Sequence, residues 1–146
     1  MSRSHETVID LKATPEEVFR AITDPEQIAK WFAPEARVEP RVGGEYYFSW
    51  GPGMEGRTTI VAWEPGKHFG TRSERSRTYG HKGPVDTGVV QQMCVDYYIE
   101  SLGGGITRLR LVQSGFGPEA AWDEEFADTK SGWVGFLKKL KELLEK

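Results

Sequence analysis

Apolar residues near the end of the chain recur three or four positions apart, which is the spacing of one helix face. The series comprises Trp122, Phe126, Trp133, Phe136, Leu137, Leu140, Leu143 and Leu144, and Thr129 fills its one gap. Acidic residues lie at the start of this segment and lysines near its end, as the helix dipole favours. The sequence therefore predicts one long amphipathic helix, from about Glu119 to Glu145, that lies on a core.

Two glycines lie in the middle of this predicted helix. Gly132 and Gly135 each cost about 1 kcal/mol relative to alanine in a helix interior. We expect either that another backbone approaches closely at these positions or that the helix bends over something there.

Strong start signals near the N-terminus predict two short helices after a strand at residues 7–11. The run Thr14-Pro15-Glu16-Glu17 combines an N-cap, a proline at the first helical position and a capping box. Asp24-Pro25 repeats the signal, so the second helix begins directly after the first. The residues expected to point inward are Val18, Phe19, Ile22, Ile28, Trp31 and Phe32.

Between residues 36 and 114, alternating polar and apolar positions predict strands joined by short turns. Glycine and proline mark turns at residues 42–45, 51–53, 64–67 and 103–105. The expected apolar positions of these strands include Tyr46, Phe48, Trp50, Met93, Val95, Tyr97, Ile99, Leu109 and Leu111. Strands with one apolar face predict an antiparallel sheet whose other face lies in solvent.

The segment 74–89 is long and polar for a turn, and it contains three glycines. Such a segment is either a functional or mobile loop or a solvated extension of a hairpin. We favour the extension. The element order then predicts an α+β fold, in which a curved antiparallel sheet of about six to seven strands wraps around the C-terminal helix. The two short helices would close one end and leave a wedge-shaped interior.

Composition and charge exclude several classes of partner. A chain of 146 residues forms one ordinary domain, here residues 1–146. The net charge of −3 indicates no positively charged surface of the kind that binds nucleic acid or anionic lipid. Cys94 is the only cysteine, so no intrachain disulfide can form, and no apolar run is long enough to cross a membrane. We expect a cytoplasmic protein.

Catalytic and metal-binding patterns are absent from the sequence. His5, His68 and His81 are scattered, and His81 with Asp86 is too little for a metal site, so we expect surface residues in loops. Cys94 has no partner nearby in sequence and is expected to be a structural or surface thiol. We therefore predict no catalytic residue, no metal and no cofactor.

Aromatic residues are the better candidates for a functional site. The predicted cavity-lining set is Trp31, Phe32, Phe48, Trp50, Phe69, Met93, Tyr97, Leu109, Trp122, Phe126 and Trp133. These side chains either fill a core or surround a ligand pocket, and the sequence leaves both alternatives open. In a pocket, Tyr46 or Tyr97 would supply a polar group.

Several motifs along the chain resemble one family. They are Ala13-Thr14-Pro15-Glu16-Glu17-Val18-Phe19, Thr23-Asp24-Pro25-Glu26, Lys30-Trp31-Phe32, Val42-Gly43-Gly44-Glu45, Gly103-Gly104-Gly105-Ile106-Thr107-Arg108-Leu109, Ser114-Gly115-Phe116 and Gly132-Trp133. Their order resembles the SRPBCC (START-like, helix-grip) superfamily, and more closely the bacterial homologues of the C-terminal domain of the heat-shock-protein-90 ATPase activator. The resemblance implies a helix-grip fold with a hydrophobic cavity between sheet and C-terminal helix. The chain departs from the pattern at Gln113, where a histidine is often found, and in its long segment 74–89.

Three functional hypotheses follow. The first is a non-catalytic protein that binds a small hydrophobic or aromatic molecule, which the resemblance also implies, because superfamily members bind lipids, sterols, polyketides and plant hormones. The second is an enzyme of cyclase or hydrolase type that uses Tyr97, Gln113 or Asp128, because a minority of the superfamily is catalytic. The third is a co-chaperone-like module that contacts a chaperone or a second copy of itself.

Overall fold

The computed structural model describes residues 3–80 and 83–146, and within them the side chains outside 74–91. Its strands are β1 (Arg3–Leu11), β2 (Glu35–Val38), β3 (Glu45–Ser49), β4 (Glu55–Glu64), β5 (His68–Gly80), β6 (Gly83–Gly103) and β7 (Ile106–Phe116). Its helices are α1 (Pro15–Thr23), α2 (Pro25–Trp31), the short 3-10 helix η1 (Ala120–Trp122) and α3 (Asp123–Leu144). The long C-terminal helix and the two short N-terminal helices agree with the prediction.

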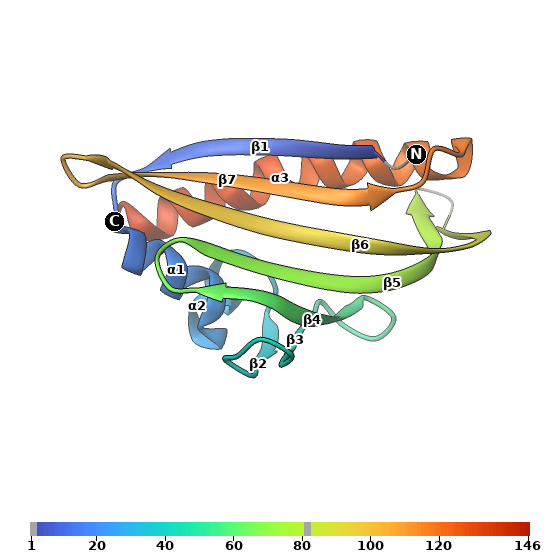
Figure 1. Ribbon diagram of the computed structural model, residues 1–146, viewed down its shortest axis with the longest axis horizontal. Coiled ribbons are helices and arrows are strands. Elements are labelled where there is room, and N and C mark those ends of the chain that lie inside the picture. Colours follow the sequence, from blue (N-terminus) through green and yellow to red (C-terminus); the bar gives the residue numbers. More distant parts are fainter. Residues whose placement is uncertain (1–2, 81–82) are drawn as a thin grey trace.

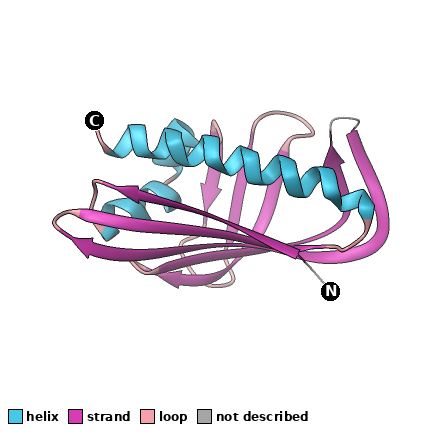
Figure 2. Cartoon of the chain, turned by 90° about the horizontal axis from the view of Figure 1, so that it is seen from above, coloured by secondary structure: helices cyan, strands magenta, loops and turns pink. Residues whose placement is uncertain are grey.

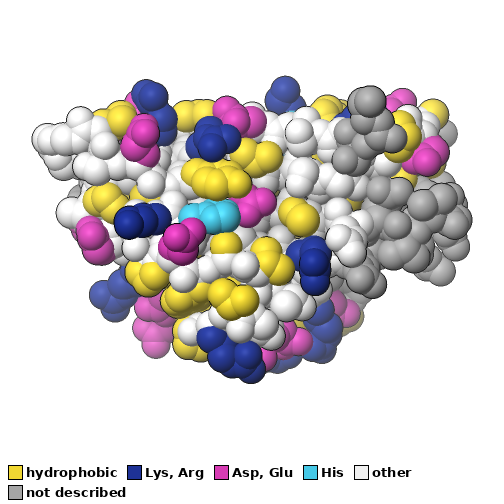
Figure 3. Space-filling view, viewed as in Figure 1, with side chains coloured by type: hydrophobic (Ala, Val, Ile, Leu, Met, Phe, Trp, Pro, Cys, Tyr) yellow, Lys and Arg dark blue, Asp and Glu magenta, His cyan; other side chains and the backbone are white. Residues whose placement is uncertain are grey.

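The strands form a seven-stranded sheet in the order β1-β7-β6-β5-β4-β3-β2, and every neighbouring pair is antiparallel. The sheet curves around α3, which covers its concave face, and α1 and α2 lie at one end (Figures 1 and 2). The α+β helix-grip prediction is therefore confirmed. The outer face of the sheet carries side chains of both charge signs, interspersed with apolar ones (Figure 3).

Local side-chain hydrogen bonds start the two short helices where the sequence predicts. The Thr14 hydroxyl accepts from the Glu17 backbone N–H at 3.1 Å, and the Glu17 carboxylate accepts from the Thr14 N–H at 3.0 Å. Asp24 ends α1 and caps α2, because its carboxylate accepts from the Glu26 N–H at 3.0 Å. These bonds satisfy amide groups that a helix start leaves without partners.

The segment 74–89 belongs to a long hairpin. Backbone pairing of β5 with β6 continues from Glu74 opposite Gln92 to Gly80 opposite Gly83, with one register shift between Arg75 and Arg77. The predicted hairpin extension is therefore confirmed over the described residues. His81, a weak candidate for a metal ligand in the sequence, lies outside them.

Two clusters of apolar side chains hold α3 on the sheet. The larger one lies toward α1 and α2 and includes Trp31, Phe69, Leu109, Leu111, Trp133, Leu137 and Leu140. The smaller one lies at the start of α3 and comprises Met93, Phe116 and Trp122, with Phe126 packed against it. The stretch of α3 between these clusters carries Gly132.

The two helix glycines do not mark close packing. A Cβ atom added at Gly132 or Gly135 would meet no heavy atom within 4 Å, so the expected close approach of another backbone is wrong. Gly135 is exposed to solvent, whereas Gly132 faces an internal space. Glycine at position 132 therefore leaves room that a side chain would occupy.

Candidate functional site

A cavity of about 670 Å³ lies between α3 and the concave face of the sheet. Strands β3 to β7 and the loop after α2 form the other walls. It is lined by Phe32, Tyr46, Phe48, Trp50, Gly53, Met54, Glu55, Gly56, Arg57, Thr58, Thr71, Ser73, Met93, Val95, Tyr97, Gln113, Asp128, Thr129, Gly132, Trp133 and Phe136. The cavity reaches the surface beside the turn between β3 and β4, where Met54 is 60% exposed.

Rings that contact one another build one wall of the cavity. Phe32 stacks nearly parallel on Trp133, with ring centroids 5.3 Å apart, and meets Trp50 and Phe136 edge-on at 5.0 and 4.9 Å. The Trp50 indole N–H donates to the Phe32 carbonyl at 2.9 Å, which fixes the ring near the mouth. The rings of this wall are thus held in place by contacts with one another.

The eleven residues predicted to line a cavity fall into two groups. Six of them line it, namely Phe32, Phe48, Trp50, Met93, Tyr97 and Trp133. The other five do not line it but pack within the two clusters, namely Trp31, Phe69, Leu109, Trp122 and Phe126. Trp31 is turned away by its indole N–H, which donates to the Ala21 carbonyl at 2.8 Å. Trp122 and Phe126 pack on Phe116, with ring centroids at 6.4 and 5.2 Å, and so belong to the smaller cluster.

Polar side chains form a different part of the wall. Thr71, Val95 and Gln113 lie opposite one another on β5, β6 and β7, and all three line the cavity. The carboxamide oxygen of Gln113 accepts from the Trp133 indole N–H at 2.7 Å. Thr71 was missed by the sequence reasoning, although its alternation with Phe69 along the strand places both on the inward face.

The two cavity tyrosines are neutral hydrogen-bonding groups. Burial raises the pKa of Tyr46, and its hydroxyl donates to the Ile22 carbonyl at 2.9 Å. Burial, and the neighbouring Tyr46, also raise the pKa of Tyr97 well above its ordinary value. Neither hydroxyl is therefore disposed to act as a base at neutral pH.

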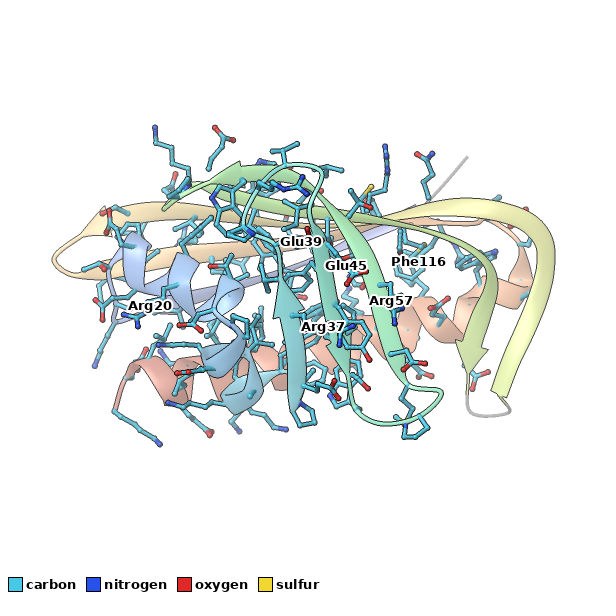
Figure 4. All side chains as sticks on the ribbon, turned by 90° about the horizontal axis from the view of Figure 1, so that it is seen from below. Arg20, Arg37, Glu39, Glu45, Arg57 and Phe116 are labelled. Atoms are coloured by element: carbon cyan, nitrogen blue, oxygen red, sulfur yellow. The ribbon has the colours of Figure 1, made fainter. Side chains whose placement is uncertain are left out.

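Charged residues cover the outer side of the β2–β4 wall. Arg37, Glu45 and Arg57 lie on three neighbouring strands, away from Arg20 on α1 (Figure 4). The Arg57 guanidinium pairs with Glu45 at 3.4 Å, and the guanidinium groups of Arg37 and Arg57 lie 4.0 and 4.8 Å from the Tyr47 ring centroid. Arg57, the arginine among the cavity-lining residues, thus has its guanidinium group held in an ion pair on the outer side of this wall.

Other reactive groups lie outside the cavity. Burial, and the nearby Asp96 charge, raise the pKa of the Cys94 thiol, which keeps it protonated rather than nucleophilic. His68 bonds to Asp96 at 2.7 Å and stacks on Tyr98, with ring centroids 4.4 Å apart. Within the described residues, no three His, Cys, Asp or Glu side chains are grouped so as to hold a metal ion.

His5 corrects the expectation that the histidines are surface residues in loops. It lies on β1, is only 5% exposed, and packs against Phe116 and Phe126 at 5.1 and 5.2 Å. The Thr129 hydroxyl donates to the Glu125 carbonyl at 2.8 Å, so the His5 Nε2–H donates to the Thr129 oxygen at 2.9 Å. The contact across β1 and α3 could not be read from the sequence, because it joins residues 124 positions apart.

The burial of His5 predicts a pH-dependent stability. Burial, and the positive charge of Lys130, lower the pKa of His5 from 6.5, so the unfolded chain takes up this proton first as the pH falls. The free energy of unfolding should therefore decrease as the pH drops below about 6.5. We expect urea unfolding between pH 7.5 and 5.5 to show a smaller loss for His5→Phe, which keeps a ring but does not titrate. Equal losses in both proteins would contradict the assignment.

Comparisons with known proteins agree with this architecture. The sequence profile of the family described as "Activator of Hsp90 ATPase homolog 1-like protein" matches residues 12–145. No curated protein matches the chain in sequence. None of the described helices is long and apolar enough to cross a membrane.

Three solved structures illustrate the structural similarity. Protein MLL2253 from Mesorhizobium loti is 25% identical, with a TM-score of 0.79 over 98% of this chain and 97% of its own. The Aha1 dimer from Colwellia psychrerythraea is 20% identical, with a TM-score of 0.77 over 98% and 96%. PFC0360w, an HSP90 activator from Plasmodium falciparum, is 17% identical, with a TM-score of 0.74 over 97% and 96%. Because the family profile spans nearly the whole sequence, the chain belongs to the family of activator of Hsp90 ATPase homolog 1-like proteins.

Proposed function

We propose that this protein binds a small hydrophobic or aromatic molecule in the cavity between α3 and the sheet. The observation that carries the proposal is a cavity of about 670 Å³ next to rings that are already packed against one another. Ligand sites typically have volumes of about 300–1,000 Å³, apolar walls and a few polar groups. The cavity matches this description, and its mouth gives a ligand access.

Fluorescence titration tests the proposal. N-phenyl-1-naphthylamine is a neutral probe whose emission rises in apolar surroundings, and we expect it to bind saturably with one site per chain. Fatty acids, sterols and flavonoid-like compounds would then be screened for displacement. Quenching of the Trp50 and Trp133 emission should accompany binding, because both indoles line the cavity. Absence of saturable binding together with no displacing compound would refute the proposal.

The same cavity supports an enzymatic alternative less well. Tyr97, Gln113 and Asp128 all line it, as such a function would require. The raised pKa of Tyr97 argues against a tyrosinate base, and Cys94 lies outside the cavity wall. We therefore assign no catalytic role to these residues.

Family membership supports a second candidate, a co-chaperone-like module. The Plasmodium structure is described as an HSP90 activator and the Colwellia structure as a dimer, and both resemble this chain in fold. A direct test measures whether the purified protein stimulates the ATPase of an Hsp90-type chaperone. Analytical ultracentrifugation of the protein alone would detect self-association. An unchanged ATPase rate at saturating protein would exclude the activator role.

A further inference from the structure

Three buried polar side chains on the sheet wall of the cavity have groups that bond to none of the described residues. Thr71, Tyr97 and Gln113 are 4%, 2% and 7% exposed, and all three line the cavity. Within the described residues, neither the Thr71 nor the Tyr97 hydroxyl lies within hydrogen-bond distance of an acceptor. Because these groups face the cavity, they are available to form hydrogen bonds with water or with a polar atom of a ligand.

The orientation of the Gln113 carboxamide follows from its partner. An indole N–H is only a donor, so the Gln113 atom 2.7 Å from Trp133 Nε1 must be the carbonyl oxygen. The amide nitrogen is therefore the end that remains for the cavity. None of the described residues offers it an acceptor at hydrogen-bond distance. Gln113 thus presents N–H donors to the cavity in a fixed orientation.

Tyr97 presents a second donor from the neighbouring strand. It is one strand away from Gln113 and two residues from Val95, which lies directly opposite Gln113. Diagonal neighbours of this kind in an antiparallel sheet are within reach of long side chains. Trp133 touches both, because it bonds to Gln113 and meets the Tyr97 ring edge-on at 6.1 Å. Since burial keeps the Tyr97 hydroxyl protonated, it can donate.

The charges of the cavity wall exclude one class of ligand. Among the lining residues that the structure describes, Arg57 is the one cation, and its side chain is 62% exposed and paired with Glu45. The lining acids are Glu55 and Asp128. A carboxylate or phosphate buried beside Gln113 would therefore lack a compensating charge, which makes its burial costly.

We propose that the ligand is a neutral, planar aromatic molecule that carries a carbonyl group. Its ring system would lie against the wall formed by Phe32 and Trp133, and its carbonyl oxygen would accept hydrogen bonds from the Gln113 amide and the Tyr97 hydroxyl. This inference rests on the proposed ligand-binding function and adds the chemical class of the ligand. Trp133 belongs to the aromatic wall and contacts both Gln113 and Tyr97, so the wall and the two donors adjoin and a single molecule can reach both.

Three matched probes test the class of ligand. The probes are 9-fluorenone, fluorene and fluorene-9-carboxylate, which share one ring system. The first carries a carbonyl group, the second carries no polar group and the third carries an anionic carboxylate. We expect 9-fluorenone to bind at least tenfold more tightly than fluorene and than the carboxylate in calorimetric or fluorescence titrations. The infrared carbonyl stretch of bound 9-fluorenone should shift to lower wavenumber than in hexane, because hydrogen bonds weaken the C=O bond.

Two tyrosine variants provide a matched comparison. Tyr97→Phe removes a hydroxyl that faces the cavity, whereas Tyr98→Phe removes one from a ring that does not line the cavity and stacks on His68. We expect Tyr97→Phe to reduce the preference for 9-fluorenone over fluorene at least threefold and to reverse part of the infrared shift. Tyr98→Phe should leave that preference unchanged. Gln113→Leu should also reduce the preference, with urea unfolding as a check that the variant folds.

The outcomes separate this inference from the function on which it rests. Equal binding of 9-fluorenone and fluorene would overturn the donor assignment but leave apolar ligand binding intact. Tighter binding of the carboxylate would overturn the charge argument. If all three fluorene probes fail while N-phenyl-1-naphthylamine binds, the proposed ligand class is wrong. If that probe fails as well, the ligand-binding function itself is refuted.

Discussion

A chain that ends at Gly117, and so lacks η1 and α3, is expected to lose cooperative folding. The missing segment supplies Trp133, Leu137 and Leu140, which are at most 8% exposed in the larger cluster. Its loss would expose the concave face of the sheet, including Leu109 and Leu111, to water. Removing one buried leucine side chain alone costs about 2–5 kcal/mol, and whole domains are stable by only about 5–15 kcal/mol. The free energy lost with η1 and α3 is therefore expected to exceed the free energy of unfolding of the domain.

Circular dichroism, urea unfolding and size-exclusion chromatography check this expectation. The shortened chain should aggregate or unfold without a cooperative transition. Addition of a peptide that spans residues 118–146 serves as the control, because it restores the missing contacts without joining them covalently. Recovery of a cooperative transition with the peptide would show that the helix, and not chain length, is decisive. A monomeric, cooperatively unfolding shortened chain would disprove the role assigned to α3.

Replacement of Gly132 by leucine is expected to abolish ligand binding without weakening the fold. Gly132 lines the cavity, and a Cβ atom there would meet nothing within 4 Å, so the new side chain enters the space a ligand would fill. The same change removes a helix glycine, which favours the folded state by about 0.8 kcal/mol. Binding and stability should therefore change in opposite directions.

Gly135→Leu is the matched control for this substitution. It removes a glycine three residues away on the same helix, yet Gly135 is exposed and does not line the cavity. We expect the affinity for N-phenyl-1-naphthylamine to fall at least tenfold in Gly132→Leu and to be unchanged in Gly135→Leu. The thermal midpoint should not fall in either variant. Undiminished binding by Gly132→Leu would place the ligand elsewhere.

Local signals explain why much of the fold could be predicted from the sequence. The capping box of Thr14 and Glu17 forms through bonds between residues three positions apart, so nothing distant is needed to recognise it. The apolar period from Trp122 to Leu144 likewise reflects one helix face. Alternation along each strand gave the inward positions, and the structure places Met93, Tyr97, Leu109 and Leu111 inside. Each of these features can be recognised from the residue pattern within a single helix or strand.

The candidate site was harder to predict, because its boundaries depend on how distant segments pack. Trp122 and Phe126 have the same helical period as Trp133, and only the position of Phe116 decides that they fill a cluster. Thr71 reaches the cavity because β5 aligns it with Val95, 24 residues later. A helix glycine such as Gly132 is compatible with crowding or with empty space, and sequence alone does not distinguish them. Strand pairing and helix packing in the folded chain decide which of these residues line the cavity.

The two apolar clusters anchor α3 on either side of the cavity. Residues between them, such as Asp128 and Gly132, line the cavity but belong to neither cluster. The effects of substitutions on the free energy of unfolding are nearly additive when the residues share no contacts. Residues of α3 between the clusters can therefore be substituted while the two clusters hold the helix on the sheet. Under the proposed function, a change of ligand preference would then need only a few exchanged side chains within one or two turns of a single helix.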